Sequence, residues 1–308
     1  MSSDIPDSIK IDGSMRMLPE NETLNRGDDP TTGQIPADQS SVEKMPNKTL
    51  STDSLRRQSS EMSLKVSVWK LVEIAVAETV GTACLVFFGC MSLINFGSVP
   101  SLQPAIGFGL VVASVVMIFG HISSSHLNPS VTLCALILGK INAVSAVVYV
   151  LSECLGAIVG IGLLNLVTPC DLWAASAPDR TVCVTAPAPG LHDAQAVAVE
   201  FSATLFLILV VCGVWDERNA DKHDSVPLKF GAVITLLAMV AGPYTGASMN
   251  PARSLGPAIL SGSFHKHWVY WIGPLLGSAV GTIFYKTIFL RKQDSVPGGA
   301  EQMPLRPT

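Results

Sequence analysis

Charged residues are scarce in this sequence. Asp, Glu, Lys and Arg make up 14% of the 308 residues, whereas an ordinary soluble domain carries roughly 25%. The shortage is uneven, because residues 1–65 hold 19 of the 44 charged residues. A soluble fold as long as residues 66–290 would need a more charged surface, so we expect this part to lie in a lipid bilayer. The net charge of −4 gives no basic field for nucleic acid, which we exclude as a partner.

Patterns that bind metals or support catalysis are missing as well. The seven cysteines form no Cys-x-x-Cys pair and no cluster with His, so we expect no metal and no cofactor. The polar residues of the apolar part contain no nucleophile–base pair, which makes an enzyme the least favoured class. Cys170 and Cys183 share one polar loop and are a candidate disulfide if that loop is extracellular; two free thiols are the alternative.

The two ends of the chain lack apolar periodicity. Residues 1–65 are rich in Ser, Asp, Pro, Asn and Thr, and no hydrophobic signal segment follows the first Met. We expect a disordered cytoplasmic tail over 1–65 and a shorter one over 291–308. Ser59 follows Arg56 and Arg57, as in sites of basophilic kinases, and is a candidate phosphorylation site. A solvated charge pair in a tail is an equally good interpretation.

Long apolar stretches fill the rest of the chain. A helix that spans a bilayer needs about 20 apolar residues. Six stretches are candidate spans, at roughly 66–94, 104–121, 141–167, 195–215, 228–242 and 267–289. The second and the fifth are each followed by an Asn-Pro motif and by an apolar segment of about half length, 129–138 and 251–260. Paired half-length segments are typical of discontinuous membrane helices.

The apolar part repeats itself with an offset of 122 residues. This offset separates Glu78 from Glu200 and Asn128 from Asn250. The two halves run over about 66–167 and 195–289. Each half contains three spans and one half-helix, and because three is odd, the second half is inverted relative to the first.

Lys and Arg lie mainly on one side of the expected bundle. If the N-terminus is inside, the inner loops and the parts of the tails next to the spans (residues 56–292) hold eleven Lys and Arg residues, whereas the outer loops hold only Arg180, Lys266 and the motif residue Arg253. The positive-inside rule then places both termini in the cytoplasm and the 168–194 loop outside. We expect an integral protein of the plasma membrane.

Two Asn-Pro motifs are the main candidates for a polar binding site. They are Asn128-Pro129-Ser130 and Asn250-Pro251-Ala252. Asn caps a helix N-terminus well and Pro is accepted at the first helical position, so each motif starts a half-helix. The inverted repeat brings the two N-termini together near the middle of the bilayer, where unpaired N–H groups, positive dipole ends and two amide NH2 groups meet. Such a site disfavours cations and suits the oxygen of water or of a small polyol.

With these motifs the sequence resembles the aquaporin, or major intrinsic protein, family over about residues 66–290. The resemblance also rests on Ala77-Glu78, Gly120-His121-Ile122-Ser123, Val199-Glu200, Tyr244-Thr245-Gly246 and Arg253. Ser130 replaces the Ala of the first family motif, a small change that keeps the capping Asn and the Pro. The resemblance implies an all-α membrane protein, a bundle of six transmembrane helices plus two half-helices, with one pore in each subunit of a homotetramer.

The resemblance places a selectivity constriction at the outer end of the pore. It implies that Phe108, Ala238, Ala247 and Arg253 form this constriction. Water-selective members have His where this chain has Ala238, so we expect a wider opening with one apolar wall, while Arg253 keeps its donors. Such an opening suits glycerol and urea as well as water. Since Ser254 replaces the Asp of classical glycerol facilitators, the chain most resembles the insect entomoglyceroporins, which combine a water-channel framework with loss of the constriction His.

Four further polar residues lie within or beside the spans. Glu78 and Glu200 are expected to accept hydrogen bonds from the non-helical backbone before each half-helix, where no water reaches; a proton relay is the alternative. His121 precedes the first half-helix and is a candidate gate, because imidazole titrates near neutral pH; a packing role is the alternative. Glu153 has no acidic counterpart in the second half, and its role stays open.

The favoured function is a passive channel for water and small neutral solutes that excludes ions and protons. A water-selective channel is the nearest alternative. An ion-coupled transporter would share the inverted repeat, but it needs oxygen ligands for a cation where this sequence places N–H donors. A junction or adhesion protein on a channel scaffold is compatible with the long N-terminal tail, although most outer loops are short.

Overall fold

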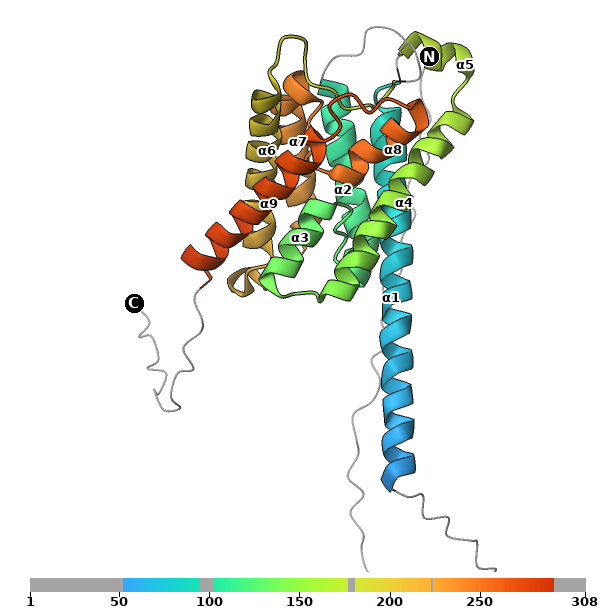
Figure 1. Ribbon diagram of the computed structural model, residues 1–308, viewed down its shortest axis with the longest axis vertical. Helices are drawn as coiled ribbons and strands as arrows, with labels where there is room; N and C mark the ends of the chain where they lie inside the picture. The colour runs from blue at the N-terminus through green and yellow to red at the C-terminus, as the bar shows by residue number, and fades with distance from the viewer. Residues whose placement is uncertain (1–51, 95–101, 177–180, 223, 291–308) are drawn as a thin grey trace, which may run out of the picture. The chain divides into compact units, whose positions relative to one another are not determined.

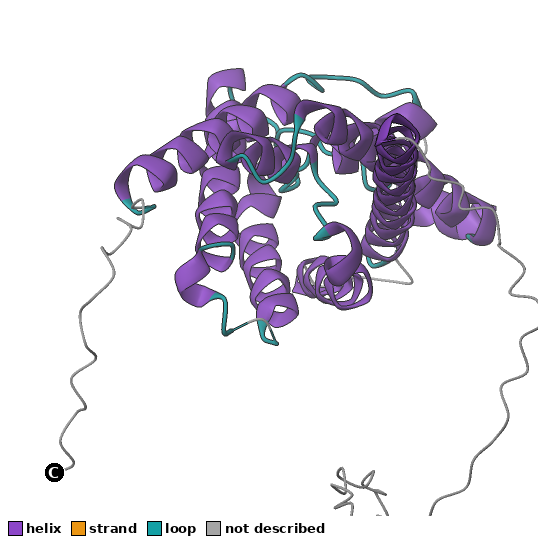
Figure 2. Cartoon of the chain, turned by 90° about the horizontal axis from the view of Figure 1, so that it is seen from below, coloured by secondary structure: helices purple, strands orange, loops and turns teal. Residues whose placement is uncertain are grey.

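The structure is a computed structural model that describes residues 52–94, 102–176, 181–222 and 224–290, with 52–67 described by their backbone alone. Within these ranges the chain forms helices, turns and loops and contains no strand (Figures 1 and 2). The long helices are α1 (Thr52–Met91), α2 (Leu102–Ser123), α4 (Ala143–Val167), α6 (Asp193–Val214), α7 (Val226–Thr245) and α9 (Val269–Ile288). The shorter ones are α3 (Pro129–Leu138), α5 (Cys170–Ser176), the 3-10 turn Glu217–Asn219 and α8 (Pro251–Ser261). Most of the N-terminal tail, 1–51, and the C-terminal tail, 291–308, lie outside the described residues.

Five helices are long and apolar enough to cross a membrane: α1 over Val68–Met91, α2, α4, α6 and α7. Helix α9 is not one of these five, although its 20 residues are as many as those of α7. The helices α3 and α8 have half the length of the others and lie between them (Figure 1). This is the all-α fold of six long helices and two half-helices that the sequence predicts.

Helix α1 begins at Thr52 and therefore includes residues 52–65, which the sequence analysis assigned to a disordered tail. The segment 54–64 contains Leu, Arg, Gln, Glu and Met, which have high helix propensity. It also continues a helix that is already formed, and extending a helix needs no new nucleus. Helix α1 thus extends further toward the N-terminus than composition indicates.

The short helix α5 between α4 and α6 was not predicted. Its Trp173 is buried in an apolar cluster with Val86 of α1 and Ile161 of α4. A single buried side chain gives a seven-residue helix no readable periodicity, which explains why the sequence did not reveal it.

Glycines allow equivalent helices of the two halves to pack closely. Helix α1 lies along α4, and α6 lies along α9. A Cβ atom at Gly156 of α4 would stand 2.4 Å from the carbonyl oxygen of Thr79, and one at Gly277 of α9 would stand 2.4 Å from that of Phe201. Because these sites correspond in the repeat, the two halves are alike in packing as well as in sequence.

The central pair of helices joins the two halves. Helix α2 packs along α7, and Gly109 meets Gly231 there, with a Cβ at Gly109 only 2.5 Å from the Gly231 carbonyl oxygen. These two glycines are also 122 residues apart. The pairing therefore brings equivalent points of the two halves face to face, as an inverted repeat requires.

Candidate functional site

Both Asn-Pro motifs begin a half-helix. The Asn128 side chain accepts a hydrogen bond from the backbone N–H of Ser130 at 2.8 Å, and that of Asn250 accepts one from Arg253 N–H at 3.1 Å. Both Asn residues have extended backbone, and a Pro follows at the first helical position. Each half-helix thus starts with a capped N-terminus at its motif.

The two motifs are linked to each other across the repeat. The side-chain amide of Asn128 donates to the carbonyl of Met249 at 2.9 Å, and that of Asn250 donates to the carbonyl of Leu127 at 2.7 Å. Each NH2 group has two hydrogens, so one donor on each Asn stays available for another acceptor. The structure therefore brings the two N-termini together.

The remaining motif residues have structural surroundings. Ser130 is fully buried, and its carbonyl accepts a hydrogen bond from the Ser278 hydroxyl of α9 at 2.6 Å. Ala252 is also fully buried and belongs to the cluster around Val86. Pro129 and Pro251 occupy the first position of α3 and α8.

The loop before each half-helix has unusual backbone. Ser125 and Leu127 have positive φ values of 46° and 55°, and the equivalent Ala247 and Met249 have values of 47° and 52°. Only glycine adopts this conformation at no cost. Such loops expose N–H groups that no helix satisfies, and in a bilayer they need a protein acceptor.

Two buried carboxylates supply that acceptor. Glu78 accepts from the N–H groups of His126 at 3.0 Å and Leu127 at 2.7 Å. Glu200 does the same for Ser248 at 2.9 Å and Met249 at 2.7 Å. Each also accepts from a hydroxyl at the end of the preceding helix, that of Ser123 and that of Thr245 respectively, at 2.6 Å in both cases. These contacts of Glu78 and Glu200 hold the two loops in place.

A cavity of about 800 Å³ passes the two capping Asn residues. Side chains of α2, α6 and α7, the loops before α3 and α8, and the segment 181–185 form its mostly apolar wall. All four side chains of the expected constriction line it: Phe108, Ala238, Ala247 and Arg253. The exposed His121 at the end of α2 does not belong to this lining.

Arg253 is fixed from two sides. Its Nη1 donates to the carbonyl of Cys183 at 2.7 Å, and its guanidinium carbon lies 4.8 Å from the centre of the Phe108 ring. A guanidinium over an aromatic face is an attractive cation–π contact. Only 6% of Arg253 is exposed, so these contacts hold a buried charge against the cavity while its other N–H donors stay available.

The disulfide differs from the one predicted. Cys183 pairs with Cys90 at the end of α1, and the two Cα atoms are 5.4 Å apart. Cys170, the expected partner, is an exposed free thiol in α5. The prediction considered only cysteines of the same polar loop. The loop folds back onto α1, and Cys183 therefore pairs with Cys90.

The sequence did not identify a buried polar chain beside the cavity. His126 lines the cavity, and its Nδ1 lies 3.0 Å from the Thr132 hydroxyl, which donates to Glu153 at 2.6 Å. His126 also stacks on Tyr149, with ring centres 4.2 Å apart. Because the Thr132 hydroxyl donates its hydrogen bond to Glu153, it accepts one from His126, which requires the tautomer with the proton on Nδ1. Glu153 thus positions a cavity-lining imidazole, a role that only three-dimensional proximity reveals.

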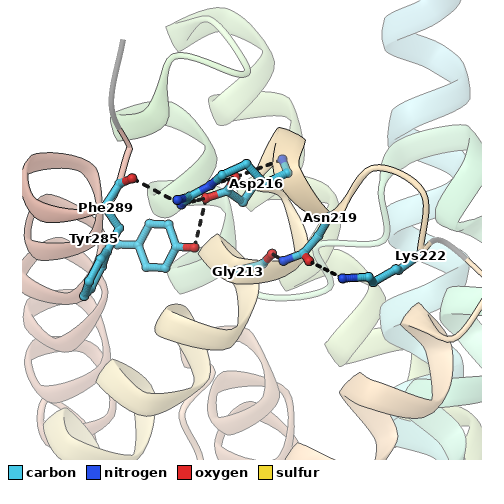
Figure 3. A network of polar contacts seen from close by, with 7 residues as sticks. Gly213, Asp216, Asn219, Lys222, Tyr285 and Phe289 are labelled. Atoms are coloured by element: carbon cyan, nitrogen blue, oxygen red, sulfur yellow. Dashed lines mark hydrogen bonds and ion pairs between the residues drawn. The ribbon is translucent and has the colours of Figure 1, made fainter. Parts of the chain in front are cut away.

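A polar network stands at the end of α6 (Figure 3). Asp216 accepts hydrogen bonds from Arg218 Nε at 2.8 Å and from the Tyr285 hydroxyl at 3.0 Å, and Arg218 also reaches the Phe289 carbonyl at 3.1 Å. The Arg218 guanidinium, helped by Tyr285, holds the pKa of Asp216 well below its usual range. The network joins the loop after α6 to the end of α9, and it begins one residue after Trp215, which lines the cavity.

Two further predictions concern phosphorylation and metal binding. The side chain of Ser59, the candidate phosphorylation site, lies outside the described residues. Among the described residues, no group of three or more His, Cys, Asp or Glu side chains is arranged to hold a metal ion.

Comparison with known proteins gives consistent matches. The family described as "Major intrinsic protein" matches residues 65–285. Human aquaporin-2 is 39% identical over 228 residues, which cover 72% of this chain and 82% of that protein. The lens fiber major intrinsic protein of Lithobates pipiens is 38% identical, with coverage of 72% and 82%. Among solved structures, the aquaglyceroporin from Plasmodium falciparum has a TM-score of 0.64 at 25% identity, covering 71% of this chain and 96% of that one.

Proposed function

Since the chain belongs to the major intrinsic protein family, we propose that it is a passive channel for water, glycerol and urea that excludes ions and protons. Channels of this family pass water and operate in a membrane as tetramers. Permeation by glycerol and urea, in addition to water, depends on the residues of the expected constriction.

Ion exclusion follows from the charges around the cavity. The N-termini of α3 and α8 both point their positive dipole ends at it, through Asn128 and Asn250. Arg253 adds a full positive charge on the same wall. A cation would lose its hydration shell here and gain only N–H donors, whereas a neutral molecule with oxygen atoms finds suitable partners.

The observation that carries the glycerol and urea proposal is the small side chain at Ala238. Phe108 and Arg253 hold each other on the lining, and the rest of the expected constriction consists of the methyl groups of Ala238 and Ala247. A ring with one polar edge and two small apolar residues accepts a molecule wider than water. Solutes with an apolar backbone and several hydroxyl or amino groups fit both kinds of surface.

The comparisons support either branch of the family. Aquaporin-2 is named for water, and the solved aquaglyceroporin is named for glycerol. The combination in this chain, a framework close to aquaporin-2 with Ala238 in the constriction, supports the entomoglyceroporin type. A water-selective channel is the alternative outcome of the test below.

We also propose that the protein lies in the plasma membrane with both termini in the cytoplasm. The excess of Lys and Arg on the inner side supports this orientation. So does the Cys90–Cys183 disulfide, which joins the end of α1 to the loop expected outside. Disulfides persist on the side of a membrane that faces an oxidising compartment.

Two substitutions at one position test the proposal. We expect Ala238→His to reduce glycerol and urea permeability at least about tenfold while water permeability stays near wild type, because imidazole narrows the opening and remains polar. Ala238→Leu fills the same space without a polar group and should reduce water permeability too. Stopped-flow light scattering on proteoliposomes measures all three solutes. Full glycerol flux through Ala238→His, with correctly assembled protein, would refute the constriction argument.

A further inference from the structure

We propose that the Cys90–Cys183 disulfide is a positioning element of the constriction, and that the channel's choice of solutes changes when this bond is broken. The inference rests on the proposed function, since it concerns the same constriction. It assigns to two cysteines a role in selectivity beyond the stability that a disulfide ordinarily gives.

The disulfide joins α1 to the wall of the cavity. Cys90 is next to the last residue of α1, and Cys183 lies in the segment 181–185, which contributes to the cavity wall. Both cysteines are buried, in the apolar cluster that also contains Val182. The bond therefore fixes a cavity-lining loop to a long transmembrane helix.

The carbonyl oxygen of Cys183 contacts Arg253. This oxygen accepts the 2.7 Å hydrogen bond from Arg253 Nη1. Cys183 has a φ of 69°, a left-handed conformation that few residues other than glycine adopt without cost. A residue in such a conformation needs surrounding contacts to keep it there. The disulfide is a direct covalent contact of this kind, and the direction of the carbonyl depends on it.

Gly89, the residue beside Cys90, lies against Phe108. A Cβ atom at Gly89 would stand 2.4 Å from the Phe108 ring, so this ring packs directly against the backbone of α1. Phe108 in turn lies under the Arg253 guanidinium. Two consecutive residues of α1 thus support both contacts of Arg253, Gly89 through the ring and Cys90 through the carbonyl.

The loop has other attachments, so breaking the disulfide leaves it in place but less constrained. The Thr185 hydroxyl lies 2.7 Å from that of Ser254, and the Ala188 N–H donates to the Tyr244 carbonyl at 2.8 Å. These bonds hold the part of the loop that follows Cys183. We therefore expect the channel to remain assembled while the Cys183 carbonyl gains freedom to turn away from Arg253.

The consequence falls on solutes larger than water. A buried guanidinium without a hydrogen-bond acceptor is costly. We therefore expect the side chain to move into the cavity that it lines, where water can accept its hydrogen bonds. An Arg253 side chain that reaches into the cavity narrows it. Glycerol and urea then lose more flux than water, and the ratio of glycerol to water permeability falls.

The experiment compares full-length channels in proteoliposomes. The variants are the double substitution Cys90→Ala/Cys183→Ala and the control Cys170→Ser, which removes an exposed thiol outside the cavity lining. Intact-mass analysis after thiol labelling determines whether Cys90 and Cys183 are paired in each preparation. Wild-type protein is also reduced with dithiothreitol: the S–S bond takes up two electrons and two protons to give two thiols, and the reductant becomes its own cyclic disulfide.

We expect the glycerol-to-water permeability ratio to fall about threefold to tenfold in the double variant and in the reduced wild type, a factor that corresponds to the loss of one hydrogen bond of ordinary net strength. Cys170→Ser should keep the wild-type ratio. The activation energy of water permeation should rise in the same two samples, because water then passes a mobile charge. If the double variant fails to assemble, the reduced wild type, folded beforehand, gives the same readouts.

An unchanged ratio and an unchanged activation energy in protein shown to lack the bond would overturn the proposal, and so would unpaired Cys90 and Cys183 in wild-type protein purified without reductant. Failure of the proposed function has a different signature, which is absence of glycerol and urea flux in the oxidised wild type. In that case the activation energy for water still decides whether the disulfide positions Arg253.

Discussion

Among single residues, the smallest side chains of the proposed constriction are expected to have the largest effect on its width. Phe108 and Arg253 occupy fixed places because each contacts the other. Ala238 and Ala247 contribute one methyl group each to the lining. A change at either alanine adds atoms directly to the passage, whereas changes behind Phe108 or Arg253 act through repositioning.

Mercury provides a test of the position of Ala247. In this family a Cys near the outer constriction often makes the channel sensitive to mercury, and Ala247 occupies that position. Cys183 is the only cysteine in the described cavity lining, and it is paired with Cys90. We expect weak block of the wild type by mercuric chloride and strong block of Ala247→Cys, measured as water permeability across a mercury titration. Mercury block of Ala247→Cys that is no stronger than that of the wild type would contradict this placement.

Among the helices, the contact between α2 and α7 determines how the two halves meet. A Cβ at Gly109 would stand 2.5 Å from the backbone oxygen of Gly231, which cannot move without shifting α7. We expect Gly109→Ala to destabilise the fold by about 1–3 kcal/mol, as overpacking of a core does.

Gly162 of α4 is the matched control for that change. It also lies in a long helix, but a Cβ there meets nothing within 4 Å. Gly162→Ala should be neutral or stabilise by up to about 1 kcal/mol through helix propensity. Thermal unfolding in detergent measures both variants. Equal melting temperatures for the two would show that the close approach at Gly109 carries no energy.

Helix positions follow from the sequence more completely than loop contacts do. The apolar spans and the Asn-Pro motifs predicted every long helix and both half-helices, because length and capping are local properties. The extension of α1 to Thr52 and the short α5 were not predicted, since composition in one case and length in the other hides the helical signal. The Cys90–Cys183 pairing depends on how a loop folds back onto α1, and spacing in the sequence does not encode that.

In the candidate site, too, local features could be predicted from the sequence, whereas contacts between distant residues could not. The capping role of Asn128 and Asn250 was readable from the motif and the repeat, as was the need for an acceptor such as Glu78. The bonds from each Asn to the carbonyl before the other half-helix join residues more than 120 positions apart. Glu153 is linked to the cavity through contacts with residues distant in the sequence, such as Thr132, which bonds His126, so no pattern of spacing points to it.

For the whole molecule, the inverted repeat explains why a single chain encloses the passage. Corresponding residues from the two halves supply the caps, the loop-holding carboxylates and the central glycine contact. The wall of the described cavity contains residues of both halves, among them Asn128 and Phe108 of the first and Asn250 and Ala238 of the second.

The most direct test of the account is the permeability of the wild-type channel to water, glycerol and urea in proteoliposomes, followed by stopped-flow light scattering. The widened constriction predicts rapid entry of glycerol and urea alongside water, well above that of protein-free vesicles. Rapid water flux with glycerol and urea at the level of empty vesicles would contradict it. That result would mean that another side chain fills the space beside Ala238 and that the protein is a water-selective channel.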